Sequence, residues 1–204
     1  MGGFRTMLAG LTGLGLSAAA GLNAYIPLLV VGVLDRLTDT VTLPAEFGWL
    51  TNGWVLALLA VLLAAEVVLD KIPAVDSVND MVQTLVRPAS GGAVFAATDA
   101  AGRLESSSFF QQHAWIGWVA GVVVALLVHL GKASVRPAVN AGTLGAGAPV
   151  VSTVEDGVSL GMSVLAILAP VVALIALLMF AYVALRLVRY AHRRRRRRRR
   201  NAAA

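Results

Sequence analysis

The chain has 204 residues, of which 58% are hydrophobic and only 14% are charged. Soluble domains contain about 25% charged residues, so the composition indicates a membrane protein. The formal net charge of +6 belongs to a tail, because eight of the 17 basic residues form the run 193–200 and the charge without that run would be −2. That tail lacks aromatic residues for stacking, which argues against nucleic-acid binding. The absence of cysteine excludes disulfides, thiolate metal ligands and a cysteine nucleophile.

Residues 8–34 form the first apolar segment, and they are long enough to span a bilayer, for which about 20 residues suffice. Small residues recur in it at three- and four-residue steps and predict close packing against another helix. Asn23 and Pro27 interrupt the segment. Because proline removes a backbone donor and frees a carbonyl, we expect a bend with exposed backbone polar groups that lines a site within the membrane.

Residues 35–52 are acidic and end among aromatic residues, which predicts an external loop, since basic residues favour the cytoplasmic side. Asn52 is a good capping residue for a second helix, 54–70, that runs inward. The strong apolar span 115–131 also runs inward by the same cues. The weak segment 77–102 between them must therefore cross outward, although its hydropathy alone would not predict a crossing.

Residues 137–152 are rich in glycine, yet they must return the chain outward, because the final apolar helix, 154–190, leads into the arginine run. We expect that helix to kink at Pro170. The sequence thus predicts an all-α polytopic membrane protein with about six crossings, two of them irregular, and with both termini cytoplasmic. Residues 1–181 would form one membrane domain, and 182–204 a cytoplasmic helix end with an Arg-rich tail.

A short repeated motif suggests that the chain has two similar halves, 8–102 and 114–181. The sequence Val-Arg-Pro-Ala occurs at 86–89 and again at 135–138, each time after a strong span and at the start of an irregular one. Four matching residues can also arise by chance in a chain rich in alanine and valine. If the repeat is real, three crossings per half make it inverted, and inverted repeats place a solute site between broken helices. The step from an inverted repeat to a solute site is an analogy with other folds, and it does not establish transport.

An acidic stripe follows the second predicted helix. Glu66 and Asp70 share one helix face. Beyond Pro73, steps of four, three and four residues place a second set on another face: Asp76, Asp80, Gln83 and Arg87. Charges within a membrane protein need partners. We therefore expect a second polar surface to face this stripe.

A cationic stripe with helical spacing is the candidate for that surface. His129, Lys132, Arg136 and Asn140 step by three, four and four residues. Both stripes follow inward-running helices, so we expect them at a similar depth in the membrane. We also expect the acidic side chains of one stripe to pair with the cationic side chains of the other. For Lys132, the favoured interpretation is an ordinary anchor that reaches the lipid headgroups.

Glu66 is the strongest candidate for proton chemistry. It lies about one helical turn inside Asp70, where a carboxylic acid can exchange protons near neutral pH. The alternative is a buried ion pair with Arg87 or Arg136, and the sequence does not separate the two.

The segment Ser152 to Glu155 fits a capping box, so capping is the favoured role for Glu155. Asp156 then continues a polar strip into an apolar helix, where a carboxylate must be protonated or paired. Catalytic signatures such as H-E-x-x-H and G-x-S-x-G are missing, and the histidines are too scattered for a metal site. We expect neither an enzyme nor a cofactor.

Several segments together resemble a known family. They are G-L-N-A-Y-I-P-L-L (21–29), E-V-V-L-D-K-I-P-A-V-D-S-V-N-D (66–80), both V-R-P-A segments, H-L-G-K-A-S-V-R-P-A-V-N (129–140) and residues 152–156. Over residues 8–181 the chain resembles the bacterial membrane proteins catalogued as domain of unknown function 4126. The resemblance implies an integral protein of the bacterial inner membrane and supplies no activity. Asn79 departs from the aromatic residue expected there, which affects only local packing.

The leading functional hypothesis is a permease or channel-like protein for a small solute or ion, coupled to protons. Its candidate pathway residues are Asn23, Pro27, Glu66, Asp70, Asp76, Asp80, Arg87, His129, Arg136, Asn140 and Asp156. The second hypothesis is a protein that binds or translocates phospholipid, with Arg87, Lys132 and Arg136 holding the headgroup phosphate. A membrane scaffold is the third. In each case we expect the arginine tail to attract anionic lipid headgroups.

Overall fold

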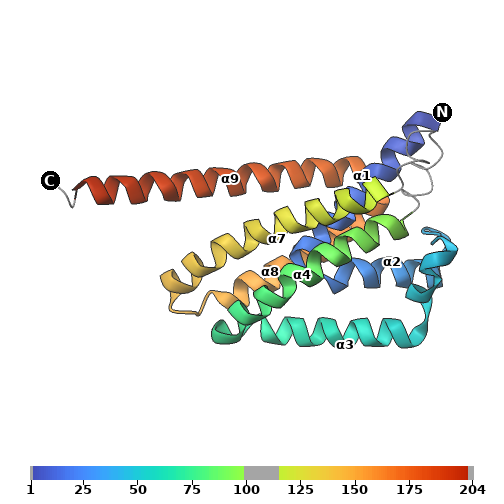
Figure 1. The fold of residues 1–204 in the computed structure, drawn as a ribbon, viewed down its shortest axis with the longest axis horizontal. Helices are drawn as coiled ribbons and strands as arrows, with labels where there is room; N and C mark the ends of the chain where they lie inside the picture. The colour runs from blue at the N-terminus through green and yellow to red at the C-terminus, as the bar shows by residue number, and fades with distance from the viewer. Residues whose placement is uncertain (1, 99–114, 202–204) are drawn as a thin grey trace.

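The structure is a computed structural model that describes residues 2–98 and 115–201, and every regular element in these ranges is a helix (Figure 1). The prediction of an all-α fold is confirmed for this part of the chain. The elements are α1 (Gly2–Leu22), α2 (Tyr25–Leu37), the 3₁₀ helix η1 (Ala45–Thr51), α3 (Gly53–Leu69), α4 (Pro73–Ala97), α7 (Trp115–Thr143), α8 (Ala148–Leu168) and α9 (Pro170–Asn201).

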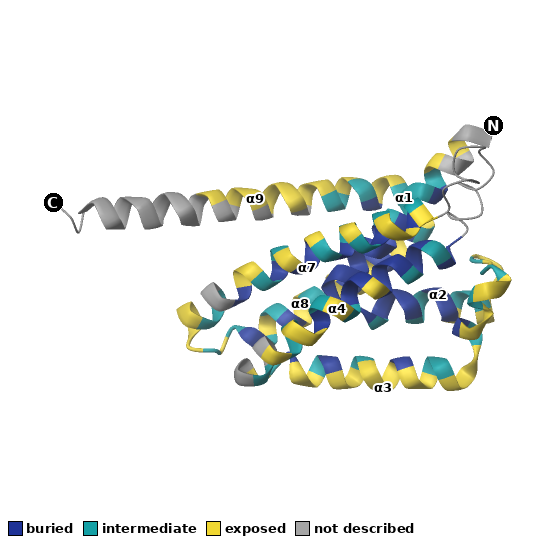
Figure 2. Ribbon diagram, in the orientation of Figure 1, coloured by how far each residue is buried: buried dark blue, intermediate teal, exposed yellow. Residues whose placement is uncertain are grey.

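Helices α3, α4, α7, α8 and α9 alternate in direction along the length of the molecule (Figure 1). Helix α1 packs against α4, α7, α8 and α9 and so forms the centre of the bundle. Buried residues concentrate around α1, α2 and α4, whereas α3 and the described part of α9 are largely exposed (Figure 2). The site described below lies among the inner helices.

Small residues allow this close packing. A side chain at Gly13 would overlap the ring of Phe95, and one at Gly21 would overlap the backbone of α7. Ser17 donates a hydrogen bond of 2.9 Å to the carbonyl oxygen of Gly91 on α4. The predicted small-residue face of the first apolar segment therefore is a packing surface.

The prediction of one bent span over 8–34 is wrong. Helix α1 ends at Leu22, and α2 runs back toward the end of the molecule where α1 begins (Figure 1). The side-chain oxygen of Asn23 accepts hydrogen bonds from the backbone amides of Tyr25 and Ile26, at 3.0 and 3.2 Å, and thereby caps the new helix. Pro27 falls in the first turn of α2, where no backbone donor is needed. These residues start a second helix rather than bend the first.

Of the two segments predicted to be irregular, 77–102 is helical as far as Ala97, and 137–152 contains a helix–turn–helix connection. Helix α4 runs unbroken through Pro88 and ends at Ala97, so residues 77–97 of the first segment are helical. Residues 99–102 lie outside the described ranges. The first part of 137–152 belongs to α7 and the last part to α8. The turn between these helices has positive φ at Leu144 (51°) and Gly145 (87°). The return that we assigned to 137–152 is therefore made by α8.

The final helix is also divided, and the reason is a proline. Helix α8 ends at Leu168, and Pro170 begins α9, which runs in the opposite direction (Figure 1). The predicted kink is thus a reversal. Because α8 begins at Ala148, the segment Ser152 to Glu155 lies inside it, and the capping-box prediction is wrong.

The ends of the chain lie at opposite ends of the molecule (Figure 1). This arrangement follows from the α1–α2 reversal and does not fit the prediction that both termini share one side. The inverted repeat is not confirmed either. Both Val-Arg-Pro-Ala segments, 86–89 and 135–138, lie inside helices and start no irregular segment.

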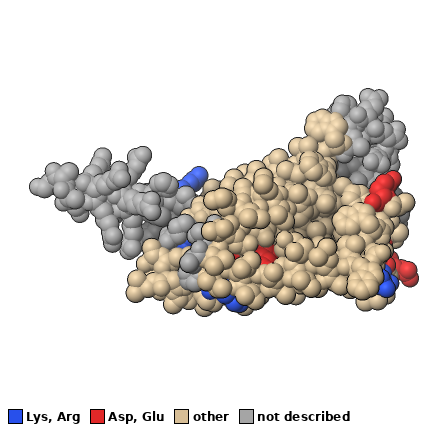
Figure 3. All heavy atoms as spheres, turned by 60° about the horizontal axis from the view of Figure 1, so that its bottom comes forward, with Lys and Arg blue, Asp and Glu red and all other residues tan. Residues whose placement is uncertain are grey.

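Within the described ranges, two helices are long and apolar enough to cross a membrane, α7 and α8. A third candidate span exists if η1 and α3 count as one, although they meet at a bend of 63°. Most of the face seen in Figure 3 is free of acidic and basic side chains. Large apolar side chains are exposed on α3 and α9, such as Val61 (65%) and Leu178 (60%). These features are compatible with a membrane protein, while six crossings are not confirmed.

Candidate functional site: a buried cluster of charged side chains

Eight ionisable side chains from four helices meet inside the bundle. Helix α3 and its C-cap contribute two, α4 two, α7 three and α8 one. We call this group the charged cluster; it consists of Glu66, Asp70, Asp80, Arg87, His129, Lys132, Arg136 and Glu155.

Arg87 holds the α3–α4 side of the cluster and is 0% exposed. Its Nη2 lies 2.7 Å from Oε1 of Glu66 and 3.7 Å from Oδ2 of Asp70, and its Nη1 lies 3.9 Å from Oδ1 of Asp80. Glu66 is therefore in a buried ion pair, and its partner is Arg87 rather than Arg136. The other carboxylate oxygen of Glu66 has no hydrogen-bond partner among the described residues.

Lys132 and Arg136 hold the α7–α8 side, and they share two carboxylates. Nζ of Lys132 lies 3.4 Å from Oδ2 of Asp70 and 2.9 Å from Oε2 of Glu155. Nη2 of Arg136 lies 2.9 and 2.6 Å from the same two atoms. Lys132 also donates to the carbonyl oxygen of Leu22 at 3.1 Å and is only 5% exposed, so its predicted role as a headgroup anchor is wrong.

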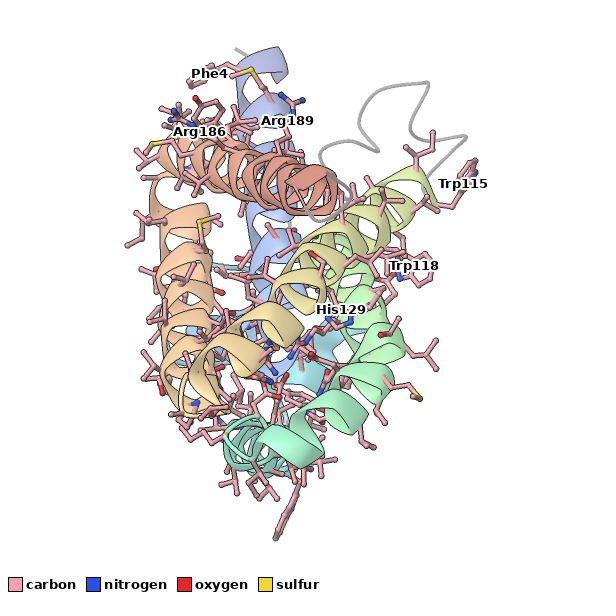
Figure 4. All side chains as sticks on the ribbon, turned by 90° about the vertical axis from the view of Figure 1, so that its left-hand side faces the viewer. Phe4, Trp115, Trp118, His129, Arg186 and Arg189 are labelled. Atoms are coloured by element: carbon pink, nitrogen blue, oxygen red, sulfur yellow. The ribbon has the colours of Figure 1, made fainter. Side chains whose placement is uncertain are left out.

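The hydrogen bonds of His129 define its tautomer. The hydroxyl of Thr84 donates its proton to the carbonyl oxygen of Asp80 at 2.8 Å, so its oxygen accepts from Nε2–H of His129 at 2.9 Å. Nδ1 then accepts from Nη1 of Arg87 at 3.1 Å. His129 lies inside the bundle between α4 and α7 (Figure 4) and is held as a neutral imidazole protonated on Nε2.

A smaller polar group closes the break between α1 and α2. Nδ2 of Asn23 donates to Oδ1 of Asp156 on α8 at 2.9 Å, so a neutral amide bonds this carboxylate, and its protonation or pairing with a charge stays a prediction. Ser90 of α4 and Ser159 of α8 donate to carbonyl oxygens at and before the break. The carbonyl oxygen of Leu22, at the end of α1, accepts from Nζ of Lys132 at 3.1 Å, so side chains of α4, α7 and α8 bond the backbone around the break.

Three other predicted pathway residues take different places. Pro27 is buried in α2, and Asn140 is half-buried one turn beyond Arg136 on α7. Asp76 lies in the first turn of α4, but its side chain is outside the described part of the chain. The two stripes therefore face each other at the residues that form the charged cluster.

Two members of the site were missed or misjudged from the sequence. Asn79 donates to Oδ1 of Asp70 at 2.6 Å, although only a role in local packing was expected for it. Glu155 was assigned to a helix cap. Its spacing from Ser152 and Ser159 by three and four residues places all three on one helix face, and that signal could have identified it as inward-facing.

A cavity of about 290 Å³ lies beside the cluster, between α7, α8 and α9. Its walls are mostly valine, and its charged side chains are those shared at the α7–α8 side of the cluster. The lining residues are Leu22, Gly131, Lys132, Val135, Arg136, Val150, Val151, Val154, Glu155, Val158 and Val183.

The charge balance of the cluster shows what it can bind. With His129 neutral, four carboxylates face three cations, so the fully ionised group carries a formal charge of −1. A net charge in a desolvated interior is costly. A bound proton or a small cation would balance it.

The fold and the site together define a helical protein with span-length apolar helices around a buried, paired charge cluster. The family model described as Domain of unknown function (DUF4126) matches residues 11–190. The chain belongs to this family, which confirms the resemblance seen in the sequence. Comparisons with curated proteins and with solved structures give no match.

Proposed function

We propose that this chain is a non-enzymatic, multi-pass protein of the bacterial inner membrane that moves a small solute or ion across the bilayer, coupled to protons. The observation that carries the proposal is the charged cluster itself. A scaffold gains little from burying five charges and half-burying two more, because well-packed apolar residues of similar volume stabilise a core at least as well. Ionisable side chains within membrane segments generally mark a solute or proton pathway.

The arrangement of the helices supports a membrane topology different from the one predicted from sequence. Five helices, α3, α4, α7, α8 and α9, run alternately between the two ends of the molecule, while α1 and α2 enter and leave at the same end. We assign five crossings and one re-entrant helix pair. We infer that the arginine run at the end of α9 lies on the cytoplasmic side and the amino terminus on the other side.

The formal charge of the cluster supports proton coupling. Its excess negative charge favours uptake of a proton when no cationic solute is present. Glu66 contributes because one of its oxygens has no hydrogen-bond partner among the described residues. A proton there would weaken the pair with Arg87 and loosen α3 from α4.

Reconstitution tests this function. Purified protein in liposomes with an internal pH dye is given gradients of a broad panel of organic anions, amino acids, sugars and monovalent cations. We expect flux with proton movement for at least one class, and a decrease of at least tenfold in Glu66→Gln. The matched control is Glu46→Gln, because Glu46 is an exposed carboxylate on η1. Absence of flux across the whole panel would overturn the proposal.

A lipid-phosphate site is the second candidate, and the apolar cavity beside Lys132 and Arg136 favours it. Arg87 does not line that cavity, so the headgroup would meet two of the three cations named from the sequence. Phospholipid that copurifies in native mass spectrometry and is lost in Arg136→Ala would support this function over transport of a water-soluble solute.

A further inference from the structure

We propose that the charged cluster binds one Na⁺ ion between α2, α3 and α4, at side-chain oxygens of Glu66 and Gln83. The role of this ion in transport rests on the proposed function, whereas its binding can be measured without transport. Three observations support the site: two buried oxygens without a hydrogen-bond partner, the helices that bring them together, and the formal charge of the cluster.

Two deeply buried oxygens lack a hydrogen-bond partner among the described residues. They are Oε2 of Glu66 and Oε1 of Gln83, and these residues are only 2% and 3% exposed. Buried polar atoms normally have a partner, and one that lacks it indicates a water molecule or an ion that belongs there. Carboxylate and amide oxygens are also the atoms that hard cations prefer as ligands.

Three helices bring these side chains together. Glu66 comes from α3, and Gln83 comes from the face of α4 that carries Arg87 four residues later. The hydroxyl of Tyr25, at the start of α2, is hydrogen-bonded to the side chain of Gln83 and interacts electrostatically with Glu66. Helices α2, α3 and α4 pack against one another here (Figure 1). The hydroxyl oxygen of Tyr25 is therefore a third oxygen beside the ion.

The ion can bind without opening an ion pair. Nη2 of Arg87 lies 2.7 Å from Oε1 of Glu66, and the proposed ligand is the other oxygen of that carboxylate. A carboxylate offers about four lone-pair positions, so it can bridge a guanidinium and a metal ion. The contacts of Lys132 and Arg136 with Asp70 and Glu155 lie on the α7–α8 side and are not disturbed.

The charge of the cluster favours a cation over a water molecule. A water molecule could donate to both oxygens, but it would leave the formal charge of −1 that the cluster carries with His129 neutral. One monovalent cation satisfies the oxygens and also brings this charge to zero. A divalent ion would bring it to +1. Within the ranges that the structure describes, no group of three histidine or acidic side chains is placed to hold a metal ion, so the site suits an alkali ion bound mainly by neutral oxygens.

Tight packing favours a small ion. Glu66, Gln83 and Tyr25 line neither the cavity of about 290 Å³ nor a smaller one of about 80 Å³ between α1, α7, α8 and α9. Their oxygens lie among packed helices, where Na⁺ fits better than the larger K⁺ or an organic cation.

Equilibrium binding of ²²Na⁺ to the full chain in nanodiscs tests this site, at constant pH and ionic strength and with empty nanodiscs subtracted. We expect saturation at one ion per chain. Unlabelled KCl should compete at least tenfold more weakly than NaCl, and N-methylglucamine chloride should not compete. Because an ion that binds only the folded protein stabilises it, NaCl should also raise the unfolding midpoint more than KCl does.

Gln83→Leu removes a neutral ligand and keeps every charge, so it should lower Na⁺ affinity at least tenfold. Ser90→Ala is the matched control and should bind like the unchanged chain, because Ser90 is also a buried polar residue of α4 but donates to the carbonyl oxygen of Ala24. Tyr25→Phe should weaken binding with little change in shape. Glu66→Gln balances the carboxylates and cations without an ion, so it should bind none. Circular dichroism in sodium-free buffer shows whether each variant is folded.

Several results would overturn the site: no saturable Na⁺ binding, equal competition by KCl or N-methylglucamine chloride, or equal Na⁺ affinity of folded Gln83→Leu and Ser90→Ala. The two oxygens would then bind water only. If Na⁺ does not bind while a solute still moves with protons in liposomes, the ion site fails and the proposed function stands. If Na⁺ binds as expected and nothing on the panel moves, the proposed function fails and the ion site stands.

Discussion

Replacing Arg87 with methionine should be among the most destabilising single changes in this chain. Asp70 would keep Lys132 and Arg136 as partners, but Glu66 would lose its ion pair of 2.7 Å while 2% exposed. Removing one partner of a buried ion pair costs about 3–5 kcal/mol, because the remaining charge has no compensation. We expect the free energy of unfolding to fall by about that amount.

The double variant Glu66→Gln/Arg87→Met tests the reason for that loss. It removes the stranded carboxylate together with its partner, so it should recover at least about 2 kcal/mol relative to Arg87→Met alone. Reversible unfolding in mixed micelles, followed by circular dichroism, gives the four free energies of the cycle. Arg36→Met is the surface control, since Arg36 is half-buried and donates a hydrogen bond to the carbonyl oxygen of Thr51 at the end of η1, and it should cost less than about 1 kcal/mol. If the two losses simply add, the pairing of Glu66 with Arg87 is not what stabilises the core.

Three further predictions follow from the fold. Gly91→Val should destabilise the protein by about 1–3 kcal/mol, because its side chain would overlap α7, whereas Gly161→Val, with no atom of another element within 4 Å, should not; the same unfolding assay compares them. His129 should show the nitrogen shifts of an imidazole protonated on Nε2 in ¹⁵N spectra, and an Nδ1–H pattern would contradict the assigned bonds to its ring. Because the chain lacks cysteine, Phe4→Cys and Arg189→Cys should react with an impermeant maleimide from opposite faces of the membrane, and labelling from one face would contradict the reversal at α1–α2.

The sequence predicts the charged cluster well because helical spacing is a local property. Steps of three and four residues bring Glu66 and Asp70 to one face, and His129, Lys132 and Arg136 to another. The cost of unpaired charge in an apolar protein then requires the two faces to meet. Neither step needs knowledge of the tertiary structure.

The reversals of the chain are less predictable, because each depends on contacts that are distant in sequence. Asn23 starts α2 as a separate helix, and side chains from α4, α7 and α8 bond carbonyl oxygens around the break. Pro170 alone indicates a kink or a reversal equally well, and packing of α9 against α1 and α8 favours the reversal. Helix α4 shows the opposite error: an irregular segment was predicted there, and the helix is continuous. Its weak hydropathy reflects side chains that pair with other helices, and it does not reflect irregular backbone.

The two sides of the cluster differ in how easily they can separate, and this difference links the stability of the protein to its proposed activity. On the α3–α4 side, Glu66 depends on Arg87 alone for its close pair, so parting these helices strands a charge. On the α7–α8 side, parting the helices would take both close cations from Glu155, whose side chain is 13% exposed, while Lys132 and Arg136 would keep Asp70 as a shared partner. Buried charges resist movement most when movement leaves them unpaired and away from water. The fold therefore places its cavity on the side where the stranded carboxylate is partly exposed and the cations keep a partner, and its fully buried pair on the side that must hold.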